Sequence, residues 1–419
     1  MERIMKDSGL PWIKDIPSYW RVMPNKYVMN KVKEIQDIYK DEDIISLSID
    51  GVKVRDLDAG GKMPTSFDGY QRIKPNRLLM CLFDIDVTPR CIGLIKDEGL
   101  TSPAYSQFVM REKGYAPYYY YYYLSLDFDK TLVHLAKNLR HSLTEDQLGA
   151  INVVVPPYIE QKAIADYLDK KTSEIDAAIK EAQELIEKYK AYKQSIITEI
   201  VTKGLNPNVT MKDSGVEWIG EIPEHWGYTR IDTLFTEGVQ KNIFYEFDHA
   251  LKFTYGALVP KNEEGDVSEL KGTYLAYSII EEDDIAINGL NLNFDFVSQR
   301  VARSPERGIL TSAYLILKPK DRRYSRYFTY QLKSWDNQKV FHGMGKGVRL
   351  TLSFAEVKKM LMPVPPLKEQ MAIADYLDDK CAKIDSIIAD KETLISRLQE
   401  YKKSIIFEYV TGKKEVPNG

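Results

Sequence analysis

The stretch PPYIEQKAIADYLDKKTSEIDAAI occupies residues 156–179, and PPLKEQMAIADYLDDKCAKIDSII occupies residues 365–388. Extended to residues 156–202 and 365–411, the two stretches are identical at 25 of 47 positions, at a constant offset of 209. After the opening Pro-Pro pair, neither stretch contains a Gly or a Pro. The sequence therefore predicts two uninterrupted helices of about 45 residues, each about 65–70 Å long at the rise of an α-helix.

Apolar residues recur along both predicted helices at spacings of three, four and seven residues, which is typical of a coiled-coil seam. Either helix alone would expose this stripe to water, so we expect the two helices to pair, in an antiparallel arrangement. The residues predicted to form the pairing are Leu168, Ile175, Ile179, Ile186, Ile196, Leu377, Ile384, Ile388, Ile395 and Ile405.

A second repeated stretch contains tryptophan. MKDSGLPWIKDIPSYW (residues 5–20) returns as MKDSGVEWIGEIPEHW (residues 211–226), with 10 of 16 positions identical at an offset of 206. The chain is thus a tandem repeat of a unit of about 200 residues. We expect the Trp motif to pin each domain to the helices. Because its second copy follows the first helix directly, the first copy should lie beside the end of the second helix.

The regions between these repeats, residues 21–155 and 227–364, match only in traces such as GLTSPAY (99–105) and GILTSAY (308–314). Short β-branched runs alternate with Gly and Asp turns, which predicts mixed domains. The fold class is therefore α/β (α+β), with two mixed α/β domains separated by two long antiparallel coiled-coil helices in a pseudo-two-fold tandem repeat. The predicted segments are a Trp motif with domain 1 (1–155), the first helix (156–205), a Trp motif with domain 2 (206–364), the second helix (365–412) and a tail (413–419).

Composition narrows the class of protein. The chain has 419 residues, 44% hydrophobic and 28% charged, with no apolar run near the length that crosses a bilayer and no signal-peptide pattern, so we expect a cytoplasmic protein without a membrane partner. Three cysteines without CxxC spacing and five scattered histidines predict neither disulfides nor a metal site. A net charge of −3 means that any nucleic-acid binding must use local patches.

Motifs of enzymes are incomplete in this sequence. Val155-Pro156-Pro157-Tyr158 is similar to the adenine-methyltransferase tetrad, but valine stands in place of the essential Asn, so we favour a helix start. HGMGKGVR (342–349) lacks the spacing of a nucleotide-binding loop, and it is either a phosphate contact or an ordinary turn. No catalytic residue is predicted, and no cofactor is expected in this chain.

The six consecutive tyrosines at residues 118–123 could stack on unpaired bases or pack in a core. At an offset of 209 they align with residues 327–332 (YFTYQL), which has the pattern of an amphipathic helix. We therefore favour packing of these tyrosines in a helical core over base stacking.

The order of Trp motif (KDSG, W, IPxxW), variable domain and PPxxEQxxIADYLD helix, repeated once, resembles the specificity subunit of type I restriction–modification systems. The resemblance covers essentially the whole chain. Its most distinctive residues are Glu160, Gln161, Ile164, Ala165, Tyr167, Leu168 and Asp169, with their counterparts Glu369, Gln370, Ile373, Ala374, Tyr376, Leu377 and Asp378.

The resemblance implies a non-catalytic scaffold that reads DNA. The two variable domains would be target recognition domains, each reading one half of an asymmetric bipartite target in double-stranded DNA. The helices would form a spacer that docks two methyltransferase (M) subunits, which bind S-adenosylmethionine and methylate adenine N6. Restriction/translocase (R) subunits would use ATP and Mg²⁺. The cofactors would therefore lie in partner subunits.

Candidate DNA-binding residues follow from side-chain chemistry, since Arg and Lys suit guanine or phosphate and Asn suits adenine. In the first domain they are Lys53, Arg55, Lys62, Arg72, Lys74, Arg77, Arg111 and Arg140; in the second they are Asn242, Lys252, Asn291, Asn293, Arg300, Arg303, Lys346 and Arg349.

Two alternatives stay open. The chain could be the recognition module of a fused restriction–methylation enzyme, although the nuclease and methyltransferase motifs of such an enzyme are missing from these 419 residues. It could also be a coiled-coil interaction scaffold without a DNA role, which would leave the two variable domains unexplained.

Overall fold

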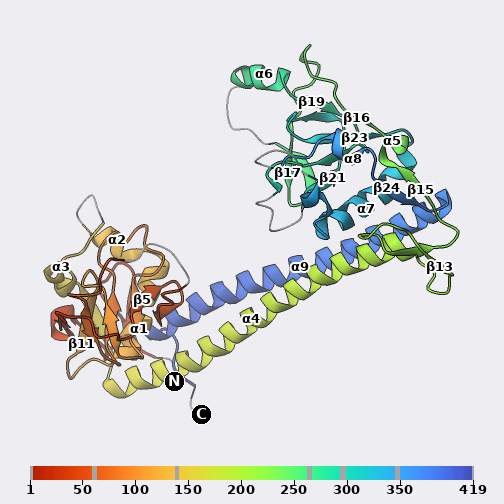
Figure 1. Cartoon of the computed structure of the whole chain (residues 1–419). Helices are drawn as coiled ribbons and strands as arrows, with labels where there is room; N and C mark the ends of the chain where they lie inside the picture. Colours follow the sequence, from red (N-terminus) through yellow and green to blue (C-terminus); the bar gives the residue numbers. More distant parts are fainter. Residues whose placement is uncertain are drawn as a thin grey trace. The chain divides into compact units, whose positions relative to one another are not determined.

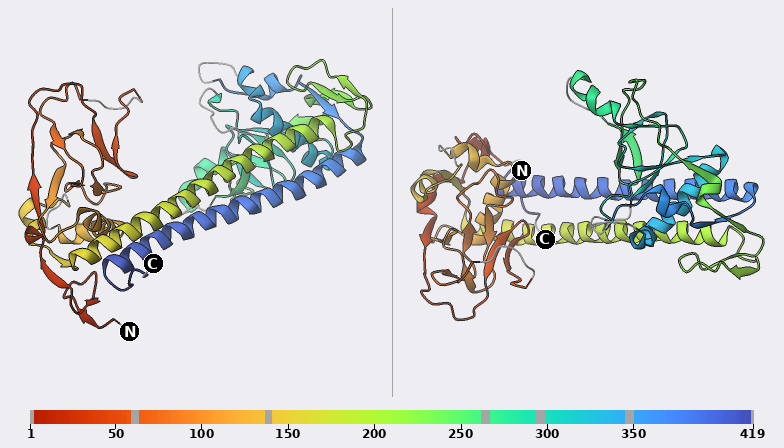
Figure 2. Two further views of the ribbon diagram at one scale, coloured as in Figure 1. Left: turned by 90° about the horizontal axis from the view of Figure 1, so that it is seen from below. Right: turned by 45° about the horizontal axis from the view of Figure 1, so that its top comes forward.

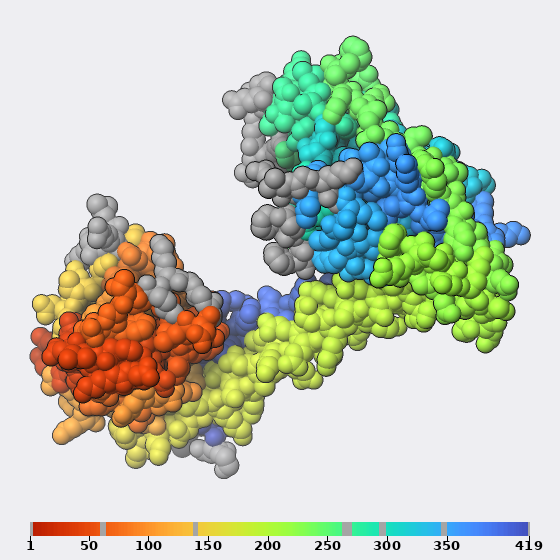
Figure 3. Space-filling model, in the orientation of Figure 1, coloured from red at the N-terminus to blue at the C-terminus, as the bar shows by residue number. Residues whose placement is uncertain are grey.

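The structure is a computed structural model of the chain (Figure 1). It describes residues 3–58, 64–136, 141–261, 267–292, 299–344 and 350–417, without the side chains of 267–269; residues of uncertain placement are grey in Figure 3. The chain divides into two compact units. Unit 1 comprises Met1–Gln183 and Glu392–Gly419, and unit 2 comprises Glu184–Lys391.

The two predicted long helices are present. Helix α4 spans Tyr158–Lys203 and helix α9 spans Leu367–Val410. Each begins just after a Pro-Pro pair, because proline lacks the N–H that would continue the preceding strand and is tolerated before the first helical turn. Gly204 and Gly412 follow the helices with φ of +74° and +72°, a left-handed conformation that suits glycine at a helix end.

Within each unit, segments of α4 and α9 run antiparallel. In unit 1 the Tyr167 and Tyr409 hydroxyls lie 3.2 Å apart, and Lys402 Nζ lies 2.6 Å from Asp176 Oδ2, so residue numbers rise along one helix as they fall along the other. In unit 2, Lys193 Nζ lies 2.6 Å from Asp385 Oδ2. Figures 1 and 2 show the helix segments side by side. The predicted antiparallel pairing is confirmed.

Unit 1 contains twelve named strands and three short helices besides the long ones, among the described residues. The strands are β1 (Met5–Asp7), β2 (Asp15–Pro17), β3 (Arg21–Pro24), β4 (Met29–Val32), β5 (Ile45–Ser48), β6 (Gly51–Val54), β7 (Gln71–Ile73), β8 (Leu78–Met80), β9 (Ile92–Leu94), β10 (Gly99–Thr101), β11 (Ser106–Met110) and β12 (Asn152–Val155). The helices are α1 (Ala116–Phe128), α2 (Thr131–Leu135) and α3 (Glu145–Ala150), with a 3₁₀ turn, η1, at Asn25–Tyr27.

Unit 2 repeats this order of strands and adds a helix, α6, between its sixth and seventh strands. Its strands are β13 (Met211–Asp213), β14 (Glu221–Pro223), β15 (Gly227–Arg230), β16 (Phe235–Glu237), β17 (Leu251–Thr254), β18 (Ala257–Pro260), β19 (Ser278–Ile280), β20 (Ile285–Ile287), β21 (Val301–Arg303), β22 (Gly308–Leu310), β23 (Leu315–Pro319) and β24 (Leu361–Val364). Its helices are α5 (Ile231–Leu234), α6 (Val267–Leu275), α7 (Ser325–Asn337) and α8 (Phe354–Val357), with 3₁₀ turns η3 (Arg322–Tyr324) and η4 (Val340–Gly343).

The two units also share their strand pairing. The four-stranded sheet of unit 1 has the order β4-β11-β8-β9, and that of unit 2 has the equivalent order β16-β23-β20-β21. Four two-stranded sheets accompany each of them: β1-β2, β3-β12, β5-β6 and β7-β10 in unit 1, and β13-β14, β15-β24, β17-β18 and β19-β22 in unit 2. Every named strand pair of unit 1 is antiparallel and has an antiparallel counterpart in unit 2.

The offset between equivalent strands shows where the copies differ in length. It is 206 residues up to the hairpins β5-β6 and β17-β18, 207 for β7-β8 against β19-β20, and 209 from β9 and β21 onward. The length differences therefore fall in two loops, which precede β7 and β9 in unit 1 and β19 and β21 in unit 2. The fold class predicted from the sequence is confirmed.

The tyrosine run forms the centre of the unit 1 core. Tyr118, Tyr119, Tyr122 and Tyr123 on α1 are fully buried, which confirms core packing rather than base stacking. The Tyr118 hydroxyl donates to the Val410 carbonyl at 2.7 Å. In unit 2 the equivalent helix α7 buries Tyr327, Phe328, Leu332 and Trp335, and the Tyr327 hydroxyl donates to the Val201 carbonyl at 3.1 Å. These tyrosines thus join each mixed domain to a long helix.

None of the helices in the described part of the chain has both the length and the apolar character needed to cross a membrane.

Candidate nucleic-acid interface

The Trp motif anchors each domain on the long helices. In unit 1, Trp20 is fully buried, and its Nε1 donates to Glu160 Oε2 at 3.1 Å, while Arg3 Nη2 contacts the same oxygen at 2.6 Å. In unit 2, Trp226 is also buried, and His225 Nε2 lies 2.9 Å from Glu369 Oε2. The first glutamate of each PPxxEQ motif therefore contacts the Trp motif that precedes the same domain.

The N-terminal Trp motif also reaches the end of the second helix, as predicted. Arg3 Nη1 donates to the Gly412 carbonyl at 3.3 Å, and Trp20 shares one apolar core with Ile405 and Ile406. In unit 1, the N-terminal segment therefore packs against the C-terminal end of α9.

Two hairpins carry some of the predicted DNA-binding residues. Lys53 lies on β6, where its Nζ pairs with Asp50 Oδ2 at 2.6 Å, and both side chains are more than half exposed. Arg55 follows β6 directly, with its backbone N–H bonded to the Ile44 carbonyl. Lys252 lies exposed on β17 of unit 2. The exposed amines of Lys53 and Lys252 can contact phosphates or base edges.

Three other predicted cations gather around two carboxylates at β7 in unit 1. Arg72 Nη2 lies 2.9 Å from Glu42 Oε1, while Lys74 Nζ and Arg77 Nη1 each lie 2.8 Å from the Glu34 carboxylate. Hydrogen bonds from Lys74 and Arg77 lower the pKa of the Glu34 carboxyl below its ordinary value. The sequence identified these cations but gave no sign that two glutamates neutralise most of their charge.

In unit 2 the predicted residues near β21 differ in accessibility. The Arg303 guanidinium pairs with Asp283 and is about one-third exposed, at 35%. Arg300 is buried, and its Nη1 donates to the Asn288 and Leu290 carbonyls at 2.8 and 2.6 Å. Its Nη2 donates to the carbonyl of Asn291, an exposed residue with a φ of +50°. Arg300 therefore holds the loop after β20 in shape.

Asn242 has a structural role as well. It is fully buried, its Nδ2 donates to the Phe247 carbonyl at 2.7 Å, and its Oδ1 accepts from the Phe247 N–H at 3.1 Å. As a correction to the sequence prediction, we assign Asn242 and Arg300 to the support of loops, because their polar atoms are bonded to the chain's own backbone.

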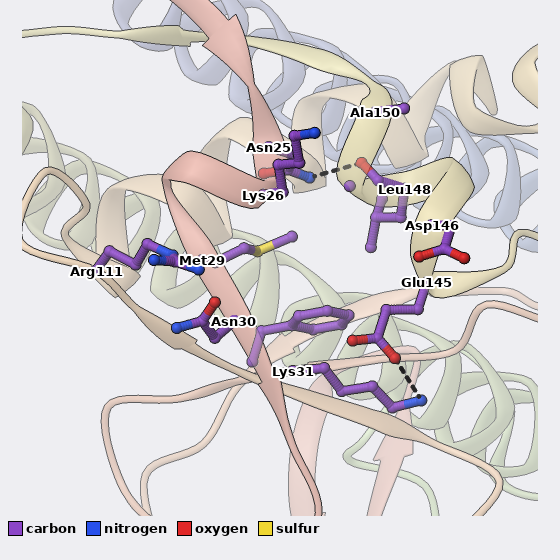
Figure 4. A pocket seen from close by; sticks show the side chains of 12 residues that line it. Asn25, Lys26, Met29, Asn30, Lys31, Arg111, Glu145, Asp146, Leu148 and Ala150 are labelled. Carbon is purple, nitrogen blue, oxygen red and sulfur yellow. Dashed lines mark hydrogen bonds and ion pairs between the residues drawn. The ribbon is translucent and has the colours of Figure 1, made fainter.

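Arg111 follows β11 at the rim of a pocket of about 290 Å³ in unit 1 (Figure 4). Figure 4 shows its guanidinium beside Met29 and Asn30, with Lys26 also on the wall. Lys31 at this pocket lies 3.5 Å from Glu145 of α3. The pocket therefore combines both signs of charge, so it is not a simple anion site.

Five candidates lie outside the described residues: Lys62, Arg140, Asn293, Lys346 and Arg349. Most of the HGMGKGVR segment (342–349), for which a phosphate contact or an ordinary turn was predicted, also lies outside the described residues. These residues stay predictions.

The predicted helix-pairing residues lie along the inner sides of the long helices. Seven are buried: Leu168, Ile175, Ile186, Ile196, Leu377, Ile384 and Ile405. Ile179, Ile388 and Ile395 are partly buried. Leu168 and Ile175 share the unit 1 core with Ile405, whereas Leu377 belongs to the main core of unit 2.

Reactive thiols and metal clusters are not found where the structure describes the chain. Cys81, Cys91 and Cys381 are buried and unbridged, and burial raises the pKa of each thiol. Within the described ranges, no group of three or more His, Cys, Asp or Glu side chains has the arrangement of a metal site.

No protein-family model matches the chain. The type I restriction enzyme MjaX specificity subunit of Methanocaldococcus jannaschii is 24% identical over 311 residues, covering 72% of this chain and 68% of that protein. The type I restriction enzyme EcoBI specificity subunit of Escherichia coli is 22% identical over 292 residues, covering 62% of this chain and 57% of that protein.

Solved structures share the fold along nearly the whole chain. A chain from a type I R-M system, studied for complex assembly and conformational transition, has a TM-score of 0.70 at 12% identity, covering 95% of this chain and 99% of that one. The HsdS subunit of Thermoanaerobacter tengcongensis has a TM-score of 0.52 at 13% identity, covering 95% and 98%. The resemblance noted in the sequence is confirmed: this chain has the fold of type I restriction–modification specificity subunits, and it is similar to them in sequence.

Proposed function

We propose that this chain is the DNA-reading subunit of a type I restriction–modification complex, and that each unit reads one half of an asymmetric bipartite target in double-stranded DNA. The observation that carries the proposal is the duplication itself. The same strand pairing occurs twice, on segments of the same two helices, while the exposed side chains of the two units differ. Two similar scaffolds with unlike surfaces suit two unlike half-sites.

The remaining parts of the proposed reaction belong to partner subunits. Two methyltransferase subunits, docked on the helices, would bind S-adenosylmethionine and methylate adenine N6, and restriction/translocase subunits would use ATP and Mg²⁺. A chain with a net charge of −3 cannot hold DNA by bulk attraction. We therefore expect the partners to supply much of the cationic surface that neutralises phosphates.

The paired helices would set the length of the unread spacer between the half-sites. An α-helix is a stiff element with a fixed rise per residue, so its length can fix a number of base pairs. The buried stripe of Ile and Leu along both helices supports this role, because pairing stiffens both of them.

A domain exchange tests the proposal. Residues 227–364 are replaced by the equivalent region of a related specificity subunit, and methylated adenines are mapped in DNA from cells that express the complete system. We expect one half of the methylated sequence to change while the other half and the spacer stay the same. A change in both halves would refute independent reading. A chain that fails to co-purify with a methyltransferase would favour an interaction scaffold without a DNA role.

A further inference from the structure

Each unit carries a two-stranded hairpin with one face fixed in a core. In unit 1, the inward face of β5-β6 consists of Ile45, Leu47 and Val52, which pack with the core residues Ile73 and Leu79. In unit 2, the inward face of β17-β18 packs in an equivalent core, through Leu251, Phe253 and Leu258. Among the described residues, each hairpin forms its own two-stranded sheet, and a single parallel bridge just before its first strand, Ile44 with Leu100 or Ala250 with Ile309, links it to a third strand. Each hairpin is therefore fixed by the packing of one face in a core, and its other face points away from that core.

The outward faces differ in chemistry. Side chains alternate along a strand, so residues between the core positions point away from the core. In unit 1 the outward residues are Ser46, Ser48 and Lys53, with Ser46 directly opposite Lys53. In unit 2 they include Lys252 and Thr254, with Lys252 directly opposite Val259. Each face thus offers one lysine and at least one hydroxyl, but the lysine lies on the second strand in unit 1 and on the first in unit 2.

Both hairpins present an exposed apolar side chain at the tip. Ile49 is 64% exposed in unit 1, and Tyr255 is 87% exposed in unit 2. Tyr255 and Gly256 have φ of +48° and +74°, as in a type I′ turn, whose first position favours Asn or Asp. A bulky residue rarely adopts this conformation. The turn itself therefore does not account for a tyrosine at this position.

We propose that the outward faces and tips of these two hairpins read base edges in the major groove, each for one half-site. This inference rests on the proposed function. The major groove, about 12 Å wide, admits a two-stranded β-ribbon. A lysine amine suits guanine, a hydroxyl suits any base, and an apolar tip can contact the thymine methyl group. Because the two faces carry these groups at different positions, they would select different sequences.

The ion pair between Lys53 and Asp50 does not prevent contact of the unit 1 face with DNA. Lys53 and Asp50 are 55% and 64% exposed, and such pairs contribute little to stability. DNA can therefore replace either partner of the pair, and the freed Asp50 carboxylate could accept a hydrogen bond from cytosine.

Substitutions in the unit 2 hairpin test the inference without disturbing its core. Lys252→Ser introduces the residue found at the equivalent position of unit 1. Tyr255→Asn introduces a residue that the turn favours, so this variant should fold at least as well. The complex containing the full chain is purified, and its affinity is measured for the methylated target sequence and for duplexes changed at one base pair each. Lys359→Ser and Tyr228→Asn, at other exposed positions of unit 2, are the matched controls.

We expect both hairpin variants to lose about tenfold of the discrimination at one or two base pairs of a single half-site, with the other half-site unaffected. Unchanged discrimination at every base pair would overturn the inference while leaving the proposed function in place. An equal loss of affinity for all duplexes, with a weaker salt dependence, would also overturn it, because that pattern indicates a phosphate contact. If the wild-type complex prefers no sequence, the proposed function itself fails.

Discussion

Identical residues of the two copies make different contacts. Gln161 closes the start of α4: its Nε2 donates to the Lys113 and Pro156 carbonyls at 2.8 and 2.9 Å, and its Oε1 accepts from the Tyr115 N–H at 2.8 Å. Gln370, its counterpart, donates to the Pro365 carbonyl at 2.8 Å, and its Oε1 has no partner among the described residues. The repeated motif predicts where both helices start, but the variable domain decides which of these bonds form.

Lys333 on α7 is another residue at which the units differ, since the equivalent residue of unit 1 is the buried Leu124. Although part of the Lys333 side chain is exposed, burial lowers the pKa of its amine below the ordinary value of 10.5, and the like charge of Lys193 lowers it further. The charged amine therefore destabilises unit 2 at neutral pH.

We predict that Lys333→Leu stabilises unit 2 by about 1 kcal/mol at pH 7. Because the unfolded chain binds the proton more tightly than the folded one, wild-type stability should rise as pH passes the lowered folded pKa toward 10.5, so the advantage of the variant should shrink. Urea unfolding between pH 7 and 10.5 measures both effects. The exposed Lys359→Leu is the control, and an advantage that grows with pH would contradict the account.

Among the elements, the long helices and the core tyrosines could be predicted because long-range repetition and periodicity record them directly. The hairpins were missed, although the Asp-Gly of residues 50–51 and the Tyr-Gly of residues 255–256 are turn signals between apolar runs. The pairing of β4 with β11, across most of unit 1, could not be predicted, because sequence alone does not say which distant strands meet. Nor could the backbone bonds of Arg300, which depend on the shape of a loop.

Helix α9 ends at a glycine that packs closely against the N-terminal Trp motif. Gly412 adopts a φ of +72°, and a Cβ there would lie 2.5 Å from Pro17 Cδ. Gly9 has nearly the same φ, +70°, with no atom within 4 Å of its Cβ position. We expect Gly9→Ala to cost about 1–2 kcal/mol for backbone strain alone. Gly412→Ala should cost a further 1–3 kcal/mol or so, through overpacking against the Trp motif.

Both glycines belong to unit 1, so the same urea transition compares them directly. Equal costs for the two variants would mean that the contact between the end of α9 and the N-terminal motif is loose.

At the scale of the whole molecule, the two copies share their scaffold and differ at their surfaces. Strand pairing and the helix motifs recur, whereas exposed positions and the lengths of two loops do not. This division suits a protein whose target changes while its method of assembly stays the same.

Lengthening both helices should lengthen the unread spacer. We propose to insert one heptad after Gln183 and another after Lys391, at the boundary between the two units on each helix. Seven residues preserve the coiled-coil seam and add about 10 Å, equivalent to roughly three base pairs. Mapping of methylated adenines should find both half-sites unchanged and the gap about three base pairs longer. An unchanged gap would contradict the spacer role, and a heptad inserted in only one helix should disrupt pairing.

The most direct measurement concerns a chain with two identical readers. Residues 227–364 are replaced by residues 21–155 of the same chain, and methylated adenines are mapped in cells that carry the complete system. If each unit reads one half-site and the two units are used equivalently, the methylated sequence becomes an inverted repeat of the half-site that unit 1 reads, with the spacer unchanged. A methylated sequence that stays asymmetric, or that no longer contains the unit 1 half-site, would contradict the account.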